Sequence, residues 1–472
     1  MIFLRLLVAL LVIGSVGMLA LQCIFPRKER LRILEWLGLA FGLGTGLVAM
    51  GMFYLAYWGI HLNTRNVVGL ALALGFLLTL LSYALGRGPA TSYLKTEVRQ
   101  SSKALRPFDV WLGLIICLPG IMLLLNTVSK PLQAFDARAI WGMKAQILFH
   151  QEGIYGEDFF DRERLHAHQR YPLLIPLAEC FVYHLIGRAD DRYARVLFPG
   201  FFISMNLTAY ATLRRFFGRR YALTGTALLM GLPAFSIFEN GGASSGYADV
   251  PLAYFCVAFV SSLFLWLCEE EPARFTLATL FGLFLIFTKQ EGLALWVLVL
   301  ASVIAVGLRS GPKPVVRLKF LCLLCLITVV SLYSWFHYRS QLPSIDEEYF
   351  SRFDVQALFM GATRLPFIVR SFLKEILLKP HLWSFLGVLV VVTLCFSPLR
   401  TLRLKHSLLF WVPSAYCALI CLVFVLSPWK VEELVPISLT RLLIHVAPLL
   451  ILWLTFQIEA IELLPKSWTR LD

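Results

Sequence analysis

Charged residues are scarce in this chain of 472 residues, of which only 15% are Asp, Glu, Lys or Arg. Globular domains average about 25% charged residues, and a soluble chain of this length needs a polar surface for two or three domains. The scarcity argues against a soluble enzyme, a disordered protein and a secreted disulfide scaffold. The short segments of alternating hydrophobicity that mark a transmembrane β-barrel are also missing.

Cysteine carries little information. Most of the 10 cysteines lie in apolar stretches, and the segments predicted to face outward are almost free of them. We therefore expect no disulfide framework. Cys322 and Cys325 have the C-x-x-C spacing but no second ligand pair, so buried apolar residues are favoured over a metal or redox site.

Long apolar runs are abundant instead. Hydrophobic residues make up 58% of the chain, and the mean hydropathy is +0.74. Runs of about 20 apolar residues recur along the whole length, which predicts an all-α, polytopic transmembrane helical bundle of about thirteen spans. We place these spans near 3–24, 34–58, 67–86, 108–128, 194–213, 221–237, 250–268, 275–288, 292–308, 318–336, 382–397, 407–426 and 444–462.

The net charge of +14 is unevenly distributed over the loops between these spans. Cytoplasmic loops of membrane proteins are rich in Lys and Arg. Alternate loops hold the cations, which predicts a multi-pass protein of the cytoplasmic (inner) membrane with its N-terminus outside, its C-terminus inside and no nucleic-acid partner. The cationic loops are Arg27–Arg32, Arg87–Arg106, Arg214–Arg220, Arg309–Lys319 and Arg400–Lys405.

Two predicted outer segments, 129–193 and 337–381, are too long to be turns. Within the first, residues 171–187 are apolar but short and contain two prolines, so we expect a juxtamembrane helix in the membrane interface rather than a span. Residues 350–379 are amphipathic and are expected on the outer surface. We divide the chain into an N-terminal three-helix unit, 1–107, and a main transmembrane unit, 108–472, which holds both outer segments.

Ionisable residues are nearly absent from the helix middles, where ion-coupled transporters place functional charges. They gather instead at the predicted outer helix ends, in five places. These are Asp136–Lys144, His166–Pro172, Glu239–Pro251, Thr288–Gly292 and Thr440–His445. The H-x-H pair in the second lacks a third metal ligand, and the glycine-rich stretch in the third lacks the ending of a phosphate loop.

Together these places bring carboxylates and cations to one face of the membrane. A carboxylate can accept the proton of an attacking hydroxyl, and cations can hold a phosphate and stabilise it as a leaving group. The combination suits group transfer from a lipid-linked phosphate whose tail stays in the bilayer. The carboxylates are Asp136, Asp249 and Glu291, and the cations are Arg138, Arg170, Lys289 and Arg441.

The order of these features resembles the polytopic GT-C glycosyltransferases, in particular the protein O-mannosyltransferases and the aminoarabinose transferases of lipid A. The resemblance covers about residues 108–460 and rests on the order and sidedness of several weak motifs. The matching elements are Asp136 in FDARAIW, Arg170–Leu173 (RYPL), Arg214–Arg220 (RRFFGRR), Asp249, Thr288–Gly292 (TKQEG) and Arg441–Pro448. Ala137 stands where many members have a second acidic residue, which puts a metal-bridged site in doubt.

The resemblance implies an inverting transfer of one sugar from a polyprenyl-phosphate donor to a hydroxyl of a glycan, lipid or protein acceptor on the outer face. It makes Asp136 the general base. It implies donor-phosphate binding by Arg170, Lys289, Arg441 and Arg138, and sugar or acceptor binding by Asp249, Glu291, Tyr247, Trp141, His168 and His445. No cofactor is identified, and a divalent metal is left open. The other partners expected are membrane lipids.

Two alternatives stay open at this point. A ligase or polymerase would transfer a whole oligosaccharide, although the outer segment 337–381 is short for a large acceptor. A lipid or solute transporter is disfavoured by the uncharged helix middles and by the lack of a detectable inverted repeat.

Overall fold

The computed structural model describes residues 1–26, 31–87, 107–130, 132–236, 238–239, 241–307, 314–343, 359, 361–396 and 405–460. Every regular element within these ranges is a helix. Parts of four predicted cationic loops lie outside the described residues, namely 27–30, 88–106, 309–313 and 400–403, as does the stretch 344–358 of the outer segment 337–381.

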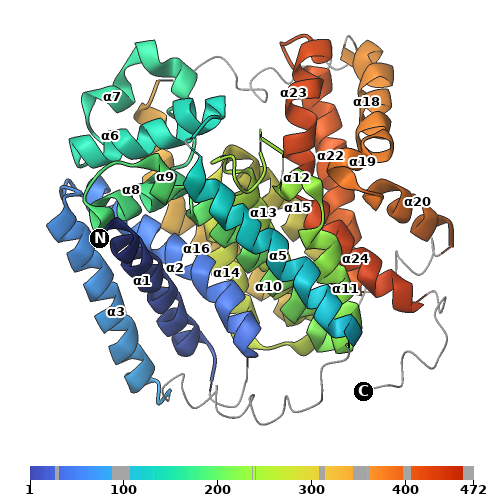
Figure 1. The fold of residues 1–472 in the computed structure, drawn as a ribbon, viewed down its shortest axis with the longest axis horizontal. Coiled ribbons are helices and arrows are strands. Elements are labelled where there is room, and N and C mark those ends of the chain that lie inside the picture. The colour runs from blue at the N-terminus through green and yellow to red at the C-terminus, as the bar shows by residue number, and fades with distance from the viewer. Residues whose placement is uncertain are drawn as a thin grey trace.

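The chain forms a helical bundle from which two groups of helices stand out at one end (Figure 1). The elements up to α10 are α1 (Ile2–Ile24), α2 (Ile33–Tyr57), α3 (Thr64–Ala84), α5 (Pro107–Ser129), η1 (Ala137–Gly142), α6 (Met143–Gln151), α7 (Glu157–Phe160), η2 (Arg162–Ala167), α8 (Leu174–Ile186), α9 (Asp191–Ala194) and α10 (Leu197–Phe216). The others are α11 (Arg219–Met230), α12 (Pro233–Ser236), α13 (Asp249–Glu269), α14 (Pro272–Thr288), α15 (Gln290–Gly307), α16 (Pro314–Gln341), η4 (Ala362–Arg364), α18 (Leu365–Leu378), α19 (Pro380–Trp383), α20 (Leu386–Phe396), η5 (Lys405–Ser407), α22 (Leu408–Leu426), α23 (Val431–Ile444) and α24 (Ala447–Ala460).

Length and hydropathy make this a polytopic helical membrane protein. Among the described residues, eight helices are long and apolar enough to cross a membrane, and α23 with α24, bent by 52° at a short break, forms a ninth if counted as one span. About thirteen spans were predicted. Four of those correspond to α11, α14, α15 and α20, which are shorter than the roughly 20 residues of a typical crossing.

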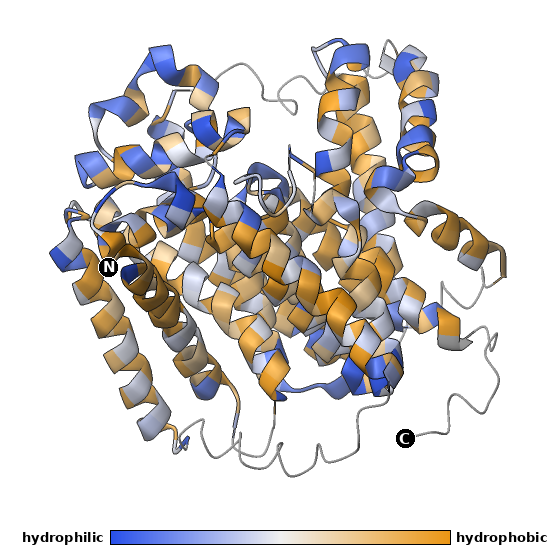
Figure 2. Cartoon of the chain, viewed as in Figure 1, coloured by the Kyte–Doolittle hydropathy of each residue, from blue (hydrophilic) through white to orange (hydrophobic). Residues whose placement is uncertain are grey.

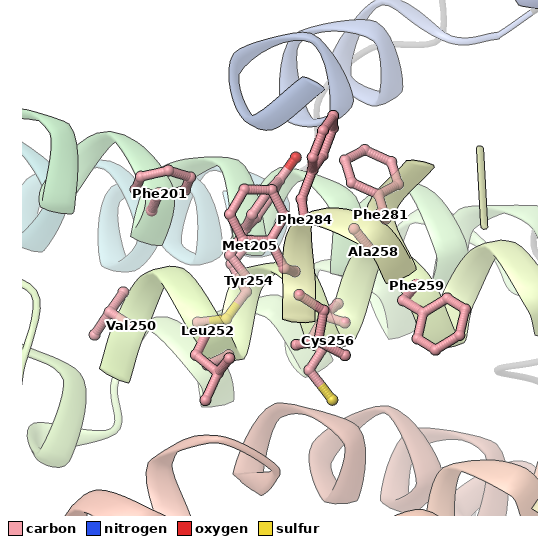
Figure 3. Packing of buried hydrophobic residues seen from close by; sticks show 14 of the residues in the cluster. Phe201, Met205, Val250, Leu252, Tyr254, Cys256, Ala258, Phe259, Phe281 and Phe284 are labelled. Carbon is pink, nitrogen blue, oxygen red and sulfur yellow. The ribbon is translucent and has the colours of Figure 1, made fainter. Parts of the chain in front are cut away.

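The central helix is α13, which is buried along almost its whole length. Aromatic rings of α10 and α14 pack against it, so that Phe201 and Tyr254 lie 5.5 Å apart between ring centroids, and Phe255 and Phe284 lie 5.8 Å apart. Figure 3 shows this packing around Tyr254. A helix that is apolar on all sides can be surrounded by lipid or by other helices, and here the burial of α13 shows that other helices enclose it.

Small residues on α2 let this N-terminal helix enter the same core. A Cβ atom on Gly42 would lie 2.0 Å from the ring of Tyr254, and one on Gly46 would lie 2.4 Å from the ring of Phe284. Glycines at four-residue spacing allow helices to approach closely in membranes. The Tyr254 hydroxyl also donates to the backbone oxygen of Gly38 at 2.9 Å. The first three helices are therefore packed directly against the rest of the bundle.

The short apolar helix α8 confirms the prediction of a helix within residues 171–187. It has 13 residues, nearly all buried, and packs against α1, α2 and α6. It is thus enclosed by other helices.

Polar residues gather at the two ends of the bundle, and apolar residues fill its middle (Figure 2). At the end where α13 finishes, Glu35 accepts from Arg274 at 2.7 Å and from Arg215 at 3.3 Å. Arg215 also bonds to Glu269, the last residue of α13, at 2.7 Å. The other end of α13 begins with Asp249, about 30 Å away at 1.5 Å per residue.

Candidate functional site

The predicted base, Asp136, lies at the start of a π-helix. The π-helical turn η1 follows directly on it. Such turns are rare and occur often at functional sites. The backbone N–H of Asp136 donates to the hydroxyl oxygen of Tyr247 at 3.3 Å. Burial and the negative charge of Asp136 raise the pKa of Tyr247, so the phenol stays protonated beside the carboxylate.

Arg441 connects Asp136 to a second carboxylate. It lies in the last turn of α23, where its Nη1 donates to Asp136 Oδ2 at 2.7 Å and its Nε donates to Asp249 Oδ2 at 3.1 Å. The guanidinium also lies over the ring of Tyr247, 4.4 Å from the centroid. This cation–π contact and the two charge-assisted hydrogen bonds fix the orientation of the guanidinium plane.

Asp249 is the fully buried centre of the cluster. Its Oδ1 accepts from Lys289 Nζ and from His445 Nε2, both at 2.8 Å, and its Oδ2 accepts from Arg441. An ionised carboxylate this deeply buried is stable only with such partners. Its position in the first turn of α13 adds the favourable field of the helix N-terminus. Asp249 therefore acts as the shared counter-ion of two cations.

A third carboxylate completes an alternating chain of charges. Lys289 Nζ lies 2.8 Å from Glu291, so the order Asp136, Arg441, Asp249, Lys289, Glu291 alternates in sign. The central carboxylate has 0% of its side chain exposed, whereas the two terminal ones have 24% and 26%. The two ends are thus the most exposed parts of this chain of charges.

A break between two helices brings Lys289 to this chain. Lys289 has an extended backbone between α14 and α15. A Cβ atom on Gly292 would lie 1.9 Å from the backbone oxygen of Leu285, so only glycine fits where the chain turns into α15. The Thr288–Gly292 motif is therefore a tight helix-to-helix connection that presents one cation.

The glycine-rich loop, residues 241–246, lies at the same end of the bundle. Gly241 and Gly246 have φ values of +153° and +81°, which favour glycine. A Cβ atom on Gly241 would lie 3.2 Å from Arg441 Cγ, and one on Gly246 would lie 2.7 Å from Leu132 Cδ1 and 3.2 Å from Ala137 Cβ. The loop approaches Arg441 on one side and the start of η1 on the other.

A second group of side chains lies at the other end of η1. Lys144, only 1% exposed, donates to the backbone oxygen of His168 at 2.6 Å and lies 5.8 Å and 5.5 Å from the ring centroids of Trp141 and Tyr171. His168 stacks on Tyr171 with 4.7 Å between centroids. Burial lowers the pKa of Lys144 well below its ordinary range, because desolvation penalises the charged form.

The structure divides the predicted site residues into two sets. Arg138 is exposed on η1, and the Nε of Arg170 donates to the backbone oxygen of Leu342 at 2.9 Å. The set joined by the contacts above is Asp136, Tyr247, Asp249, Lys289, Glu291, Arg441 and His445. The predicted residues outside that set are Arg138, Trp141, His168 and Arg170.

One member of the cluster was not predicted. The hydroxyl of Tyr416, in the middle of α22, lies 2.8 Å from His445 Nδ1. In the sequence it is one aromatic residue in an apolar span, where core packing is the ordinary role, and no motif marks it. Only the contact with His445 distinguishes it from other buried tyrosines.

The carboxylates do not suit a divalent metal. Within the described ranges, no group of three or more His, Cys, Asp or Glu side chains is placed to hold one. Asp136 and Asp249 each direct an oxygen at Arg441, and Asp249 Oδ1 faces Lys289. These oxygens are already neutralised by cations, which would repel a metal ion.

Comparison of the chain with protein-family models gave no match. Searches of curated proteins and of solved structures likewise gave no significant match. The chemistry of the site therefore rests on its own residues. It offers a partly exposed carboxylate beside a guanidinium, an ammonium group nearby, and a tyrosine that contacts both members of the first pair.

Proposed function

We propose that this chain is an integral-membrane glycosyltransferase of the GT-C kind, which moves one sugar from a polyprenyl-phosphate donor to a hydroxyl of a glycan, lipid or protein acceptor. The observation that carries the proposal is Arg441, which bonds to both Asp136 and Asp249 where the central helix begins. A cation there suits a phosphate whose lipid tail lies in the bilayer, and the carboxylate beside it suits activation of a hydroxyl.

The proposed reaction is a single displacement. The acceptor oxygen attacks the anomeric carbon of the sugar, and Asp136 accepts the proton that this oxygen loses. The bond from the anomeric carbon to the phosphate oxygen breaks with its electron pair, leaving polyprenyl phosphate with one more negative charge. Arg441 and Lys289 stabilise that charge, and the anomeric configuration inverts.

The hydrogen bond between Asp136 and Arg441 implies that the donor binds before Asp136 accepts the proton. While Asp136 Oδ2 accepts the hydrogen bond from Arg441, that oxygen is not available to the acceptor hydroxyl. Donor phosphate oxygens compete with Asp136 for Nη1 of Arg441, whose Nε stays bonded to Asp249. Donor binding thus releases Asp136 to act on the acceptor.

The remaining predicted residues take supporting roles in the proposal. Arg138, exposed on η1, meets the donor phosphate or the lipid surface, and Arg170 stays a donor-phosphate candidate. Glu291 holds Lys289, and Tyr247 holds Asp136. Trp141 and His168, grouped around Lys144, form the sugar or acceptor side of the site.

We place the site on the outer face of the cytoplasmic membrane, with the N-terminus outside and the C-terminus inside. The support is the cationic loop distribution in the sequence, including Arg214–Arg220 at the end of α10. In this arrangement the nine candidate spans and four short helices make up the thirteen crossings. The short helices are α11, α14, α15 and α20.

The substitution Asp136→Asn tests the reaction. We expect at least about a thousandfold loss of transfer, because the amide cannot accept the proton. Binding of a polyprenyl phosphate should persist or strengthen, because Arg441 loses a competitor. Transfer is measured by mass spectrometry of the product from nanodisc-embedded protein, which also separates the addition of one sugar from transfer of a block.

A matched control is Asp158→Asn, which removes another carboxylate that is paired with an arginine, 2.6 Å from Arg164. Its transfer rate should equal that of the parent. Full transfer by the Asp136→Asn variant would remove Asp136 from the role of base.

A lipid or solute transporter is the second candidate, favoured by one observation. The pair α23 and α24 is a broken helix bent by 52°, and transporters build binding sites at such breaks. Movement of a lipid phosphate across proteoliposomes without chemical change, undiminished by Asp136→Asn, would support transport over transfer.

A further inference from the structure

Two buried residues behind the charged chain form a second layer. Tyr416 lies in α22 and His445 lies at the break between α23 and α24, and both are almost fully buried. The Tyr416 hydroxyl lies 2.8 Å from His445 Nδ1, and His445 Nε2 lies 2.8 Å from Asp249 Oδ1. The contacts run from one helix, through the break, to the carboxylate that holds both cations.

The donors and acceptors of this layer follow from Asp249. An ionised carboxylate can only accept hydrogen bonds, so His445 donates from Nε2. In the neutral ring Nδ1 is then an acceptor, and the Tyr416 hydroxyl donates to it. The phenol thus selects one of the two tautomers of the imidazole, as partners of metal-bound histidines do.

A neutral histidine has a distinct effect here. Lys289 and Arg441 already share the charge of Asp249. An imidazole that donates one hydrogen bond fixes the carboxylate plane without adding a third positive charge next to the two cations. The orientation of that plane decides where Lys289 Nζ and Arg441 Nε are held.

We propose that Tyr416 and His445 are positioning residues, which act through Asp249 to hold Lys289 and Arg441 in the geometry that binds the donor phosphate. The inference rests on the proposed function, since it assigns the two cations to a phosphate. Neither residue touches the reacting atoms. Their contribution is a further restraint on the direction of the Asp249 carboxylate, whose terminal torsion is intrinsically broad and is otherwise held only by the two cations.

A purely structural role would have a different signature. The same contacts tie α22 to α13 and α23, so their loss could lower stability alone. Tyr254 provides the comparison, since it is also a fully buried tyrosine and its hydroxyl donates to the backbone oxygen of Gly38 at 2.9 Å. Tyr254→Phe removes a similar buried bond that leads to α2 and away from the charged chain.

The test uses the full chain in nanodiscs, with farnesyl phosphate as the probe and empty nanodiscs as the baseline. Affinity is measured by calorimetry, and stability by the midpoint of thermal unfolding. We expect Tyr416→Phe to weaken farnesyl phosphate binding about tenfold, the effect of one lost hydrogen bond, at a midpoint close to that of Tyr254→Phe. Tyr254→Phe should bind the probe as the parent does.

Variants of His445 test the role of its hydrogen bond to Asp249 and its coupling to Tyr416. His445→Gln keeps an N–H donor for Asp249 and should bind more tightly than His445→Leu. In the His445→Leu background, Tyr416→Phe should have no further effect on binding, because the two residues act in series. Equal binding by the Tyr416→Phe and Tyr254→Phe variants would overturn the positioning role.

The substitution Arg441→Lys distinguishes a wrong positioning role from a wrong phosphate site. If Arg441→Lys weakens the probe but Tyr416→Phe does not, the positioning role is wrong and the phosphate site stands. If Arg441→Lys and Lys289→Gln both fold and bind farnesyl phosphate as the parent does, the phosphate site is wrong, and the positioning role that depends on it is overturned too.

Discussion

Two buried lysines show how single residues are accommodated in this protein. Lys289 lies between two carboxylates, each 2.8 Å from its ammonium group. Lys144 has instead a backbone oxygen and two aromatic rings around it. A buried ammonium group is stabilised strongly by opposite charge and only weakly by neutral partners. The two residues therefore differ in what their burial costs the folded state.

The substitution Lys144→Met tests how Lys144 makes the stability of the protein depend on pH. Burial lowers the pKa of Lys144 well below the ordinary lysine value of 10.5. Between the lowered value and 10.5 the unfolded chain binds more protons than the folded one, so this residue makes stability rise with pH. Removing the titrating group removes that rise. We expect the variant to gain about 2–4 °C over the parent in unfolding midpoint at pH 6.5, and less at pH 9.5.

The matched control is Lys430→Met, because the side chain of Lys430 is largely exposed. Its difference from the parent should be the same at both pH values. A Lys144→Met difference that does not change with pH would contradict the assignment of this dependence to Lys144.

Several residues of the candidate site lie at interruptions of helices and not within regular helices. Asp136 lies next to a π-helical turn, Lys289 in an extended residue between two helices, and His445 at the break of a bent helix pair. Straight apolar helices satisfy all their backbone groups internally and direct their side chains at neighbouring helices or lipid. A break is therefore where a membrane helix can bring a polar side chain to a common point.

Gly246→Ala tests the loop that supports one of these interruptions. Gly246 has a φ of +81°, and an added Cβ would meet Leu132 Cδ1 at 2.7 Å and Ala137 Cβ at 3.2 Å. We expect a loss of about 1–3 kcal/mol of stability from the strained backbone. Transfer should fall about tenfold, since η1 and Asp136 shift.

Gly14→Ala serves as the control, because Gly14 lies within α1 and an added Cβ has nothing within 4 Å. Stability should be unchanged or slightly higher, and transfer unchanged. Parent-like transfer by the Gly246→Ala variant would show that the loop does not set the position of Asp136.

The molecule as a whole has ionic clusters at both ends of its central helix. Asp249 begins α13 within the candidate site, and Glu269 ends it within the network of Glu35, Arg215 and Arg274. Glu35 comes from the N-terminal three-helix unit and joins it to α10 and α14. The division at residue 107 is still a prediction, although α2 packs deep in the common core.

Glu35→Ala tests the distant cluster. Its loss leaves the buried Arg274 without its nearest carboxylate, which lies at 2.7 Å in the parent. Breaking a buried ion pair costs about 3–5 kcal/mol. We expect a clear fall in the unfolding midpoint, while binding of farnesyl phosphate by the folded fraction is kept, because the site is about 30 Å away.

Glu433→Ala is the paired control, since the contact of Glu433 with Lys430 is 3.8 Å long and largely exposed. It should leave the unfolding midpoint unchanged, as exposed ion pairs contribute little. Weakened probe binding by a folded Glu35→Ala variant would show that the two ends are coupled.

The sequence alone determined the class of the protein and singled out several residues that meet in the charged cluster. Scarce charge and repeated apolar runs are sufficient to predict a polytopic helical membrane protein, because a bilayer imposes length and polarity on every crossing. Charges at helix ends also stood out, so Asp136, Asp249, Lys289 and Arg441 could be selected from motifs. The number of crossings stays a prediction beyond the eight or nine candidate spans, since hydropathy does not show how long an apolar run stays in one straight helix.

Only the tertiary structure decided which of these charges meet. Arg441 contacts a carboxylate 305 positions away, whereas Arg170, closer to Asp136 in sequence, donates to the backbone oxygen of Leu342. Such pairings depend on helix crossings and breaks that no local pattern contains. Tyr416 is the clearest case, because its polar role exists only through a hydroxyl that reaches His445 from another helix. Scarce charge predicts a membrane protein, and three-dimensional packing decides how its few buried charges form one cluster.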